Sequence, residues 1–175
     1  SMNRYPLLKY ILIAVALTLG LLYTLPNFYG EAPAVQVSSI KAAVKEGERA
    51  FKQLGLKAIN VEPGFGSPPR NADDPMLFPI YDVCDQLGVP VSIMSGPTAP
   101  SLDMVNPAAV GHVARAFPNL SIICYHGFYP YVNEIIGVAF RWENVFIVPD
   151  MYIFSPGGGL YVEAANGCMR HQILY

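Results

Sequence analysis

One histidine ends an apolar run in the middle of the chain, in the stretch "IICYHGFYP" of residues 122–130. The β-branched residues before it are typical of a buried strand. An imidazole can bind a metal ion or transfer protons near neutral pH, so His126 is the first candidate for chemistry. A core histidine that is hydrogen-bonded to a backbone carbonyl group explains the stretch equally well. The residues alone leave both interpretations open.

Three more polar residues follow apolar runs of the same kind. They are Glu62 in "VEPGF", Ser95 in "SIMSG" and Asp150 in "VPDMY". In α/β folds the catalytic and binding residues gather at the carboxyl ends of the strands. We therefore expect these three side chains to bind substrate beside His126. A helix cap or a loop turn would account for Glu62 and Asp150 as readily.

The elements that must position these residues alternate along the chain at a spacing of roughly 30 residues. Helical patterns cover residues 40–55, 75–87, 107–117, 131–142 and 159–169, and the strand patterns are "LKAINV", "VPVSIM", "LSIICY", "NVFIV" and "HQILY". Continuous apolar strands between helices predict a parallel α/β sheet. An open doubly wound sheet and part of a (β/α)₈ barrel both fit this pattern. Five units fall short of the roughly 250 residues of a whole barrel.

The composition indicates a membrane segment as well. Hydrophobic residues make up 53% of the chain and charged residues only 14%. Residues 10–25 carry no charge and follow Arg4 and Lys9, which predicts one transmembrane helix with its N-terminus in the cytoplasm. Sixteen residues span about 24 Å, so a buried core helix is the alternative.

The charges and cysteines exclude other classes. The net charge is −2 and no basic patch alternates with aromatic residues, so we expect no nucleic-acid partner. Cys84, Cys124 and Cys168 are far apart, which argues against a disulfide framework or a zinc knuckle and favours buried free thiols.

Residues 1–39 carry a specific resemblance in the stretches "NRYPLLKY" and "LPNFYGEAPAVQVSS". They resemble the N-terminus of the SecD family, which are subunits of the bacterial protein-export machinery. The resemblance implies an anchor in the bacterial inner membrane. No later part of the chain resembles that family, so a membrane-anchored export component is an alternative function.

Residues 40–175 carry a second resemblance, in "LGLKAINVEPGF", "VPVSIMSG", "FPNLSIICYHG" and "RWENVFIVPDMY". They resemble the amidohydrolase-related family of metal-dependent (β/α)₈ hydrolases and decarboxylases. The resemblance implies the C-terminal half of a TIM barrel, located in the cytoplasm. It also implies a small carboxylated or aromatic substrate, and a divalent metal, most often zinc, with His126 as ligand or acid–base group.

The departures from that family are equally specific. The family's first-strand histidine motif is missing, Met94 stands where a histidine is usual, and the family's last acidic residue would fall beyond Tyr175. A catalytic zinc ion needs about three protein ligands, so we expect little turnover and, in this chain, no firmly held metal. A fusion of two unlike segments and a non-catalytic pseudoenzyme scaffold are further interpretations. Open sheet edges also predict an oligomer or a place in a larger chain.

Overall fold

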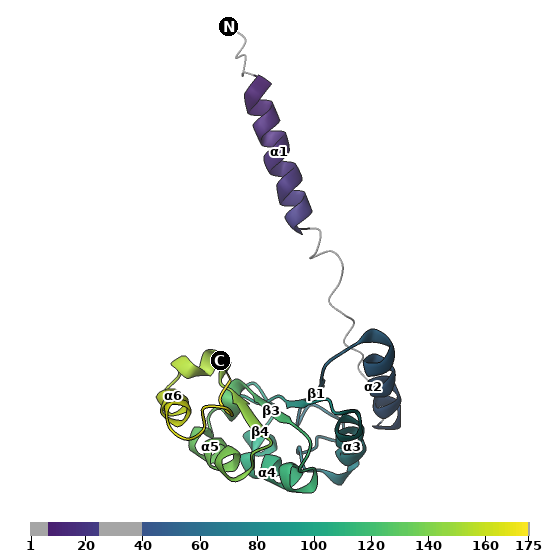
Figure 1. Ribbon diagram of the computed structural model, residues 1–175, viewed down its shortest axis with the longest axis vertical. Helices are drawn as coiled ribbons and strands as arrows, with labels where there is room; N and C mark the ends of the chain where they lie inside the picture. The colour runs from purple at the N-terminus through teal and green to yellow at the C-terminus, as the bar shows by residue number, and fades with distance from the viewer. Residues whose placement is uncertain (1–6, 25–39, 175) are drawn as a thin grey trace. The chain divides into compact units, whose positions relative to one another are not determined.

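The computed structural model describes the backbone of residues 7–24 and 40–174, and the side chains of residues 10–18 and 40–174 (Figure 1). The chain divides into two compact units, Ser1–Gln36 and Val37–Tyr175. The first unit contains helix α1 (Leu7–Thr24). The second unit contains every other helix and strand of the described residues.

Helix α1 confirms the predicted helix but not the predicted membrane span. The sequence predicted a transmembrane helix over residues 10–25, and α1 has 18 residues. At about 1.5 Å per residue it is about 27 Å long, slightly less than a hydrocarbon core of about 30 Å. Among the described residues no helix is both long and apolar enough to cross a membrane. The predicted span is therefore not supported.

The second unit alternates helices and strands in the predicted order. Its helices are α2 (Ile40–Leu54), α3 (Phe78–Leu87), α4 (Pro107–Ala116), α5 (Val132–Arg141) and α6 (Gly159–Asn166). Its strands are β1 (Ile59–Val61), β2 (Val91–Ile93), β3 (Ile122–Tyr125) and β4 (Val145–Val148). Helix α6 stops before the predicted Met169 because Gly167 follows Asn166 and its backbone leaves the helical conformation.

The four strands form one parallel sheet in the order β1-β2-β3-β4. A doubly wound sheet reverses its strand order at a switch point, and these strands do not. Crossovers of one hand and one direction place their helices on one side of the sheet. Helices α3, α4, α5 and α6 accordingly follow one another along the sheet (Figure 1). Of the two predicted architectures, this order is that of a TIM-barrel segment.

The prediction of a fifth strand at "HQILY" is wrong for the described residues of that segment. The segment pairs with β4 through one isolated parallel bridge between Ile147 and Ile173. The Ile147 N–H donates to the Gln172 carbonyl at 2.7 Å, and the Leu174 N–H donates to the Ile147 carbonyl at 2.8 Å. Tyr175 lies outside the described residues. Two hydrogen bonds at one position are too few to make a strand.

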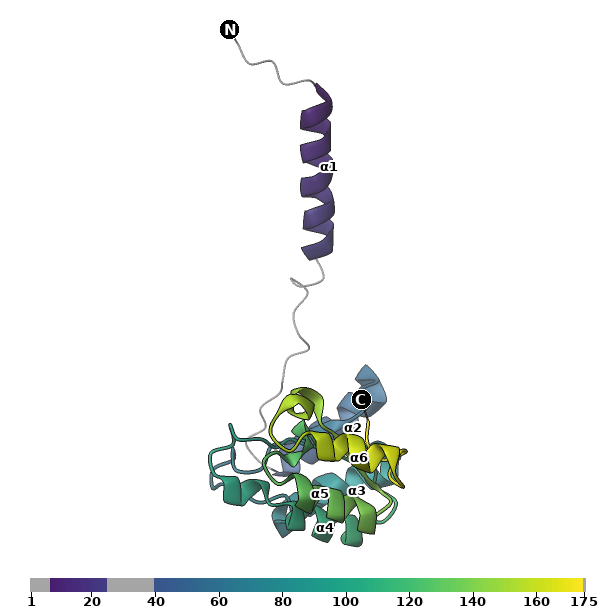
Figure 2. The ribbon, with the colours of Figure 1, turned by 90° about the vertical axis from the view of Figure 1, so that its left-hand side faces the viewer.

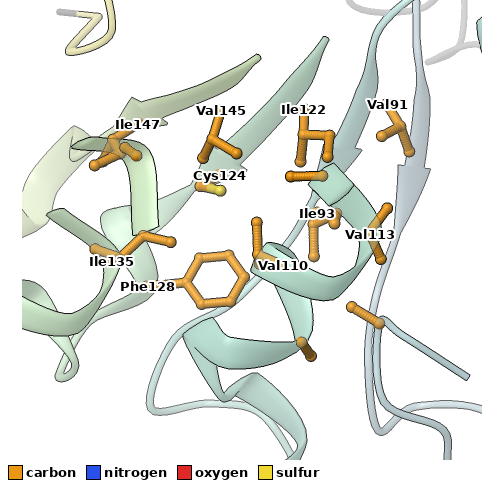
Figure 3. Close-up of a cluster of buried hydrophobic side chains, with 14 of the residues drawn as sticks. Val91, Ile93, Val110, Val113, Ile122, Cys124, Phe128, Ile135, Val145 and Ile147 are labelled. Atoms are coloured by element: carbon orange, nitrogen blue, oxygen red, sulfur yellow. The ribbon is translucent and has the colours of Figure 1, made fainter. Parts of the chain in front are cut away.

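The core lies between the sheet and its helices. Alternate strand residues are fully buried there: Val91 and Ile93 of β2, Ile122 and Cys124 of β3, and Val145 and Ile147 of β4. They face Val110 and Val113 of α4 and Ile135 of α5, which are also fully buried (Figure 3). Burying each such aliphatic side chain stabilises the fold by about 1.5–3 kcal/mol.

The opposite face of the sheet is less covered. Asn60, Ser92, Ile123 and Phe146 form one row across the four strands, in register. Asn60 is exposed and the other three are half-buried. In a closed barrel this face lines the interior. The strands therefore bury one face against their own helices and leave the interior face partly open.

Candidate functional site

The predicted site residues follow the carboxyl ends of parallel neighbouring strands. Ser95 follows β2, His126 follows β3, and Asp150 follows β4 after one proline. Because the strands are parallel and adjacent, these ends meet at the same edge of the sheet. The structure brings His126 and Asp150 together directly and Ser95 to their side. It does not join Glu62 to them.

His126 and Asp150 form the centre of the candidate site. The distance between His126 Nδ1 and Asp150 Oδ2 is 3.1 Å, with 23% and 39% of the two side chains exposed. The two atoms lie within ion-pair distance, but their geometry does not make a hydrogen bond, so the buried Nδ1 has no hydrogen-bond partner among the described residues. A buried ring nitrogen without such a partner is uncommon in folded proteins.

The backbone at both residues adopts an unusual conformation. His126, Gly127 and Phe128 have φ angles of 58°, 60° and 58°, and Asp150 has 56°. These are left-handed values, which cost about 1–2 kcal/mol for each residue with a side chain. Strained backbone of this kind clusters at functional sites, where the surrounding structure holds it. The turn after β3 is thus specified by its neighbours and not by local preference.

Ser95 holds the strand end immediately before this turn. Its side chain is 4% exposed, and its hydroxyl donates to the Tyr125 carbonyl at 3.0 Å. Because the hydroxyl already donates to the last residue of β3, no contact supports substrate binding by Ser95, which stays a prediction. The next residue, Gly96, has φ 140°, and a Cβ there would lie 3.7 Å from Tyr152 Oη and 3.8 Å from His126 Cδ2. The loop after β2 therefore lies against the histidine.

Aromatic side chains surround His126, and sequence reasoning missed them. The Tyr125 and Tyr152 rings lie edge-on to the imidazole at centroid distances of 5.4 and 5.6 Å. Tyr129 stacks on Tyr152 at 4.9 Å with an interplanar angle of 11°. Edge-on and stacked pairs of this kind are favourable arrangements for aromatic rings. The signal was present, because Tyr152 follows Asp150 by two residues in "VPDMY".

Glu62 lies apart from this cluster. Its exposed side chain accepts a hydrogen bond from the Asn60 amide at 3.1 Å. Among the described residues no hydrogen bond or ion pair joins Glu62 to His126 or Asp150. Substrate binding by Glu62 stays a prediction that no contact supports.

A shallow hollow on the protein surface is lined by α2 alone, and none of the predicted site residues lines it.

The other histidines do not extend the site. His112 Nδ1 lies 2.7 Å from Asp73 Oδ2, and 64% of that histidine side chain is exposed. His171 is exposed next to the single bridge of the last segment. The pair of His112 and Asp73 thus resembles that of His126 and Asp150 in composition but is more open to water. It serves as an internal control for the experiments below.

The two buried thiols, Cys84 and Cys124, are not nucleophiles of the candidate site. Cys84 and Cys124 are buried, as predicted, whereas Cys168 is exposed, so the prediction is wrong for that residue. Burial raises the pKa of Cys84 to about 12 and the pKa of Cys124 further. Both buried thiols therefore stay protonated at neutral pH, and a thiol in that form is a poor nucleophile. Cys124 points into the core shown in Figure 3.

The described residues do not fit a firmly held metal ion. No group of three or more histidine, cysteine or acidic side chains is close enough to bind one within residues 10–18 and 40–174. His126 and Asp150 could supply two ligands at most, and a catalytic zinc ion needs about three. Met94 follows β2 with a thioether, which is a poor zinc ligand.

The fold and this edge define a TIM-barrel type of α/β protein with a histidine–carboxylate pair at the ends of its strands. The amidohydrolase family model matches residues 25–165, and the chain therefore belongs to the amidohydrolase family. This finding confirms the resemblance seen in the sequence. The solved structure of an uncharacterised TIM-barrel protein from Bordetella bronchiseptica is similar, with 34% identity and a TM-score of 0.74. That similarity covers 81% of this chain and 50% of that protein.

Two decarboxylases are similar to this chain at lower sequence identity. The 2-amino-3-carboxymuconate-6-semialdehyde decarboxylase of Dictyostelium discoideum is 28% identical over an alignment of 105 residues. The alignment covers 50% of this chain and 29% of that protein. A dihydroxybenzoic acid decarboxylase from Polaromonas sp. JS666, solved with bound manganese and 2-nitroresorcinol, has 19% identity and a TM-score of 0.56. The similarity covers 78% of this chain and 54% of that decarboxylase. This last likeness shows the fold alone.

A different relative matches a short segment. The protein translocase subunit SecD of Salmonella choleraesuis (strain SC-B67) is 58% identical over 53 residues. These residues are 30% of this chain and 8% of that protein. The match confirms the resemblance to SecD and shows that it is local. The chain thus spans a small part of the SecD proteins and about half of the Bordetella protein.

Proposed function

We propose that residues 40–175 are the C-terminal half of an amidohydrolase barrel that binds a small aromatic or carboxylated molecule at His126. One observation carries the proposal, which is the 3.1 Å approach of Asp150 Oδ2 to His126 Nδ1 at the carboxyl ends of β3 and β4. In related folds this edge holds the reacting groups. Family membership supports a hydrolase or decarboxylase type of reaction.

His126 acts in this proposal as the acid–base group. Asp150 orients the ring and keeps the proton of the pair at Nδ1, so that Nε2 exchanges a proton with the bound molecule. Catalytic hydrogen bonds are often poorly aligned before a ligand binds, which fits the orientation of Nδ1. Tyr152, whose ring contacts the imidazole, supplies a flat surface for an aromatic ligand.

We also propose that this chain by itself catalyses little or no turnover. A divalent metal serves in this family to polarise a water molecule or a substrate, and the described residues supply two ligands for one. After dialysis against zinc or manganese salts, we expect well under one metal ion per chain by elemental analysis. Stoichiometric metal that is lost in the His126→Ala variant would contradict this part of the proposal.

Ligand binding tests the proposal directly. In a titration of the isotope-labelled chain with benzoate or benzyl alcohol, we expect NMR shift changes at Tyr125, Asp150 and Tyr152. His126→Ala should abolish these changes, whereas His112→Ala, the matched control in the more exposed pair, should keep them. Shifts that persist in His126→Ala, or that gather elsewhere on the protein, would refute the proposal.

The local match to SecD supports a second candidate function. In this proposal residues 1–39 are an anchor in the bacterial inner membrane, and the chain is a component related to protein export. Such a protein should stay in the membrane fraction after a carbonate wash, and a chain without residues 1–39 should not. Recovery of the whole chain in the supernatant would remove this candidate. A non-catalytic scaffold remains if both ligand binding and membrane attachment fail.

A further inference from the structure

The left-handed turn after β3 is held on both sides of His126 by side-chain hydroxyl groups. On one side Ser95 binds the Tyr125 carbonyl. On the other side Tyr161 Oη donates to the Gly127 carbonyl at 2.8 Å. Tyr161 lies on α6, 34 residues after Gly127 in the chain, and its side chain is fully buried.

The contact between Tyr161 and this turn is also tight. A Cβ on Gly127 would lie 2.5 Å from Tyr161 Oη and 2.7 Å from Cζ, closer than real atoms approach. Glycine avoids the cost of a left-handed backbone at position 127, and it leaves the space that the tyrosine ring occupies. The turn and the ring fit together as one unit.

The hydroxyl of Tyr161 is a permanent donor. Burial, with a smaller contribution from nearby Tyr129, raises the pKa of Tyr161 far above its ordinary value of 10.0. The hydroxyl is therefore protonated at neutral pH and can donate a hydrogen bond. It donates to the Gly127 carbonyl whatever the charge of the histidine next to it.

We infer that Tyr161 is a positioning residue, which sets the direction of the His126 imidazole by holding the carbonyl group of Gly127. This carbonyl belongs to the peptide between Gly127 and Phe128, so the hydrogen bond from Tyr161 fixes the backbone of the left-handed turn whose first residue is His126. If the turn relaxed, the backbone of His126 would shift with it. The ring would then move relative to Asp150. This inference rests on the proposed function, because it gives Tyr161 a part in the same site.

A matched control exists within the chain. Tyr81 is also fully buried, and its hydroxyl donates to the Ala72 carbonyl at 2.6 Å. That hydrogen bond lies beside Asp73, in the loop that pairs with His112. Tyr81→Phe therefore removes the same kind of hydrogen bond from the same kind of environment, but away from His126.

The experiment compares the ring nitrogen-15 resonances of the three histidines in the full-length wild type, Tyr161→Phe and Tyr81→Phe, with His126→Gln to assign the signals. Tyr161→Phe should shift both ring resonances of His126 and leave those of His112 and His171 in place. Tyr81→Phe should leave His126 unchanged. Both variants should lower the Tm by similar amounts, since each loses one buried hydrogen bond.

Three results would overturn the inference. The first is that the His126 resonances of Tyr161→Phe coincide with those of the wild type. The second is that Tyr81→Phe shifts the His126 resonances as much as Tyr161→Phe does. The third is that Tyr161→Phe fails to fold where Tyr81→Phe folds, because Tyr161 would then support the whole domain and not this turn. Failure of the benzoate titration would refute the proposed function alone, because the ring resonances are measured without a ligand.

Discussion

Replacement of Gly127 by alanine should destabilise the protein much more than the same change at Gly88. Both glycines have left-handed backbones, with φ angles of 60° and 62°. Alanine in that conformation costs about 1–2 kcal/mol at either position. The two positions differ in their surroundings, because a Cβ on Gly88 meets no atom within 4 Å.

The additional loss at Gly127 follows from Tyr161. The new methyl group would need the space 2.5 Å from Oη and 2.7 Å from Cζ, and the ring is fully buried. Overpacking of a filled core costs about 1–3 kcal/mol, and loss of the hydrogen bond to the Gly127 carbonyl costs about 1 kcal/mol more. We therefore expect a total of about 3–6 kcal/mol for Gly127→Ala.

Urea unfolding followed by circular dichroism measures this difference. The midpoint should fall for both variants with an unchanged m-value, and the loss for Gly127→Ala should exceed that for Gly88→Ala by at least about 2 kcal/mol. Equal losses would refute the argument, since they would mean that the ring and the turn do not press on each other.

Three further predictions concern other parts of the fold. Gln172→Leu should destabilise the protein by about 1–3 kcal/mol in urea unfolding, because this buried amide donates to three backbone carbonyl groups at 2.6, 3.0 and 3.0 Å; an unchanged midpoint would contradict it. The pKa of Asp74 lies below its usual 3.8, first because it accepts the Met76 N–H and then because of Arg70. The ionised Asp74 carboxylate therefore stabilises the folded state above its unfolded pKa, and this stabilisation is lost as the pH falls through the lower folded pKa. Between about pH 5 and pH 2.5 the Tm should drop less for Asp74→Asn than for the wild type; equal drops would refute this. Light scattering should give a mass above the 19.1 kDa of one chain, because the interior face of the sheet is partly open; a monodisperse monomer would contradict it.

Periodic patterns predicted most of the fold. Apolar residues at helical spacing and continuous apolar runs mark elements whose burial is local in the sequence, and the five helices and the first four strands formed in the predicted order. The prediction of a strand at "HQILY" was wrong because a strand needs several successive pairs with its neighbour, and this segment pairs with β4 at one position. An apolar run in the sequence does not show how many such pairs will form.

The candidate site was predicted only in part. His126 and Asp150 were found because the carboxyl ends of parallel strands meet. The contribution of Tyr161 depends on α6 packing beneath a turn 34 residues earlier, and no local pattern encodes that contact. The left-handed angles of His126 and Phe128 were equally hidden, since both residue types prefer other conformations and tertiary contacts override the preference. Glu62 follows a strand like the others but turns to Asn60.

The pairing of His126 with Asp150 is the central claim, and one spectrum tests it most directly. The Asp150 carboxylate faces His126, and the Asp73 carboxylate faces His112. The ring nitrogen-15 resonances of the histidines should be compared in the wild type, in Asp150→Asn and in Asp73→Asn. Our account predicts that Asp150→Asn shifts the resonances of His126 and leaves His112 unchanged, and that Asp73→Asn does the reverse. His126 resonances that stay in place in Asp150→Asn would contradict it.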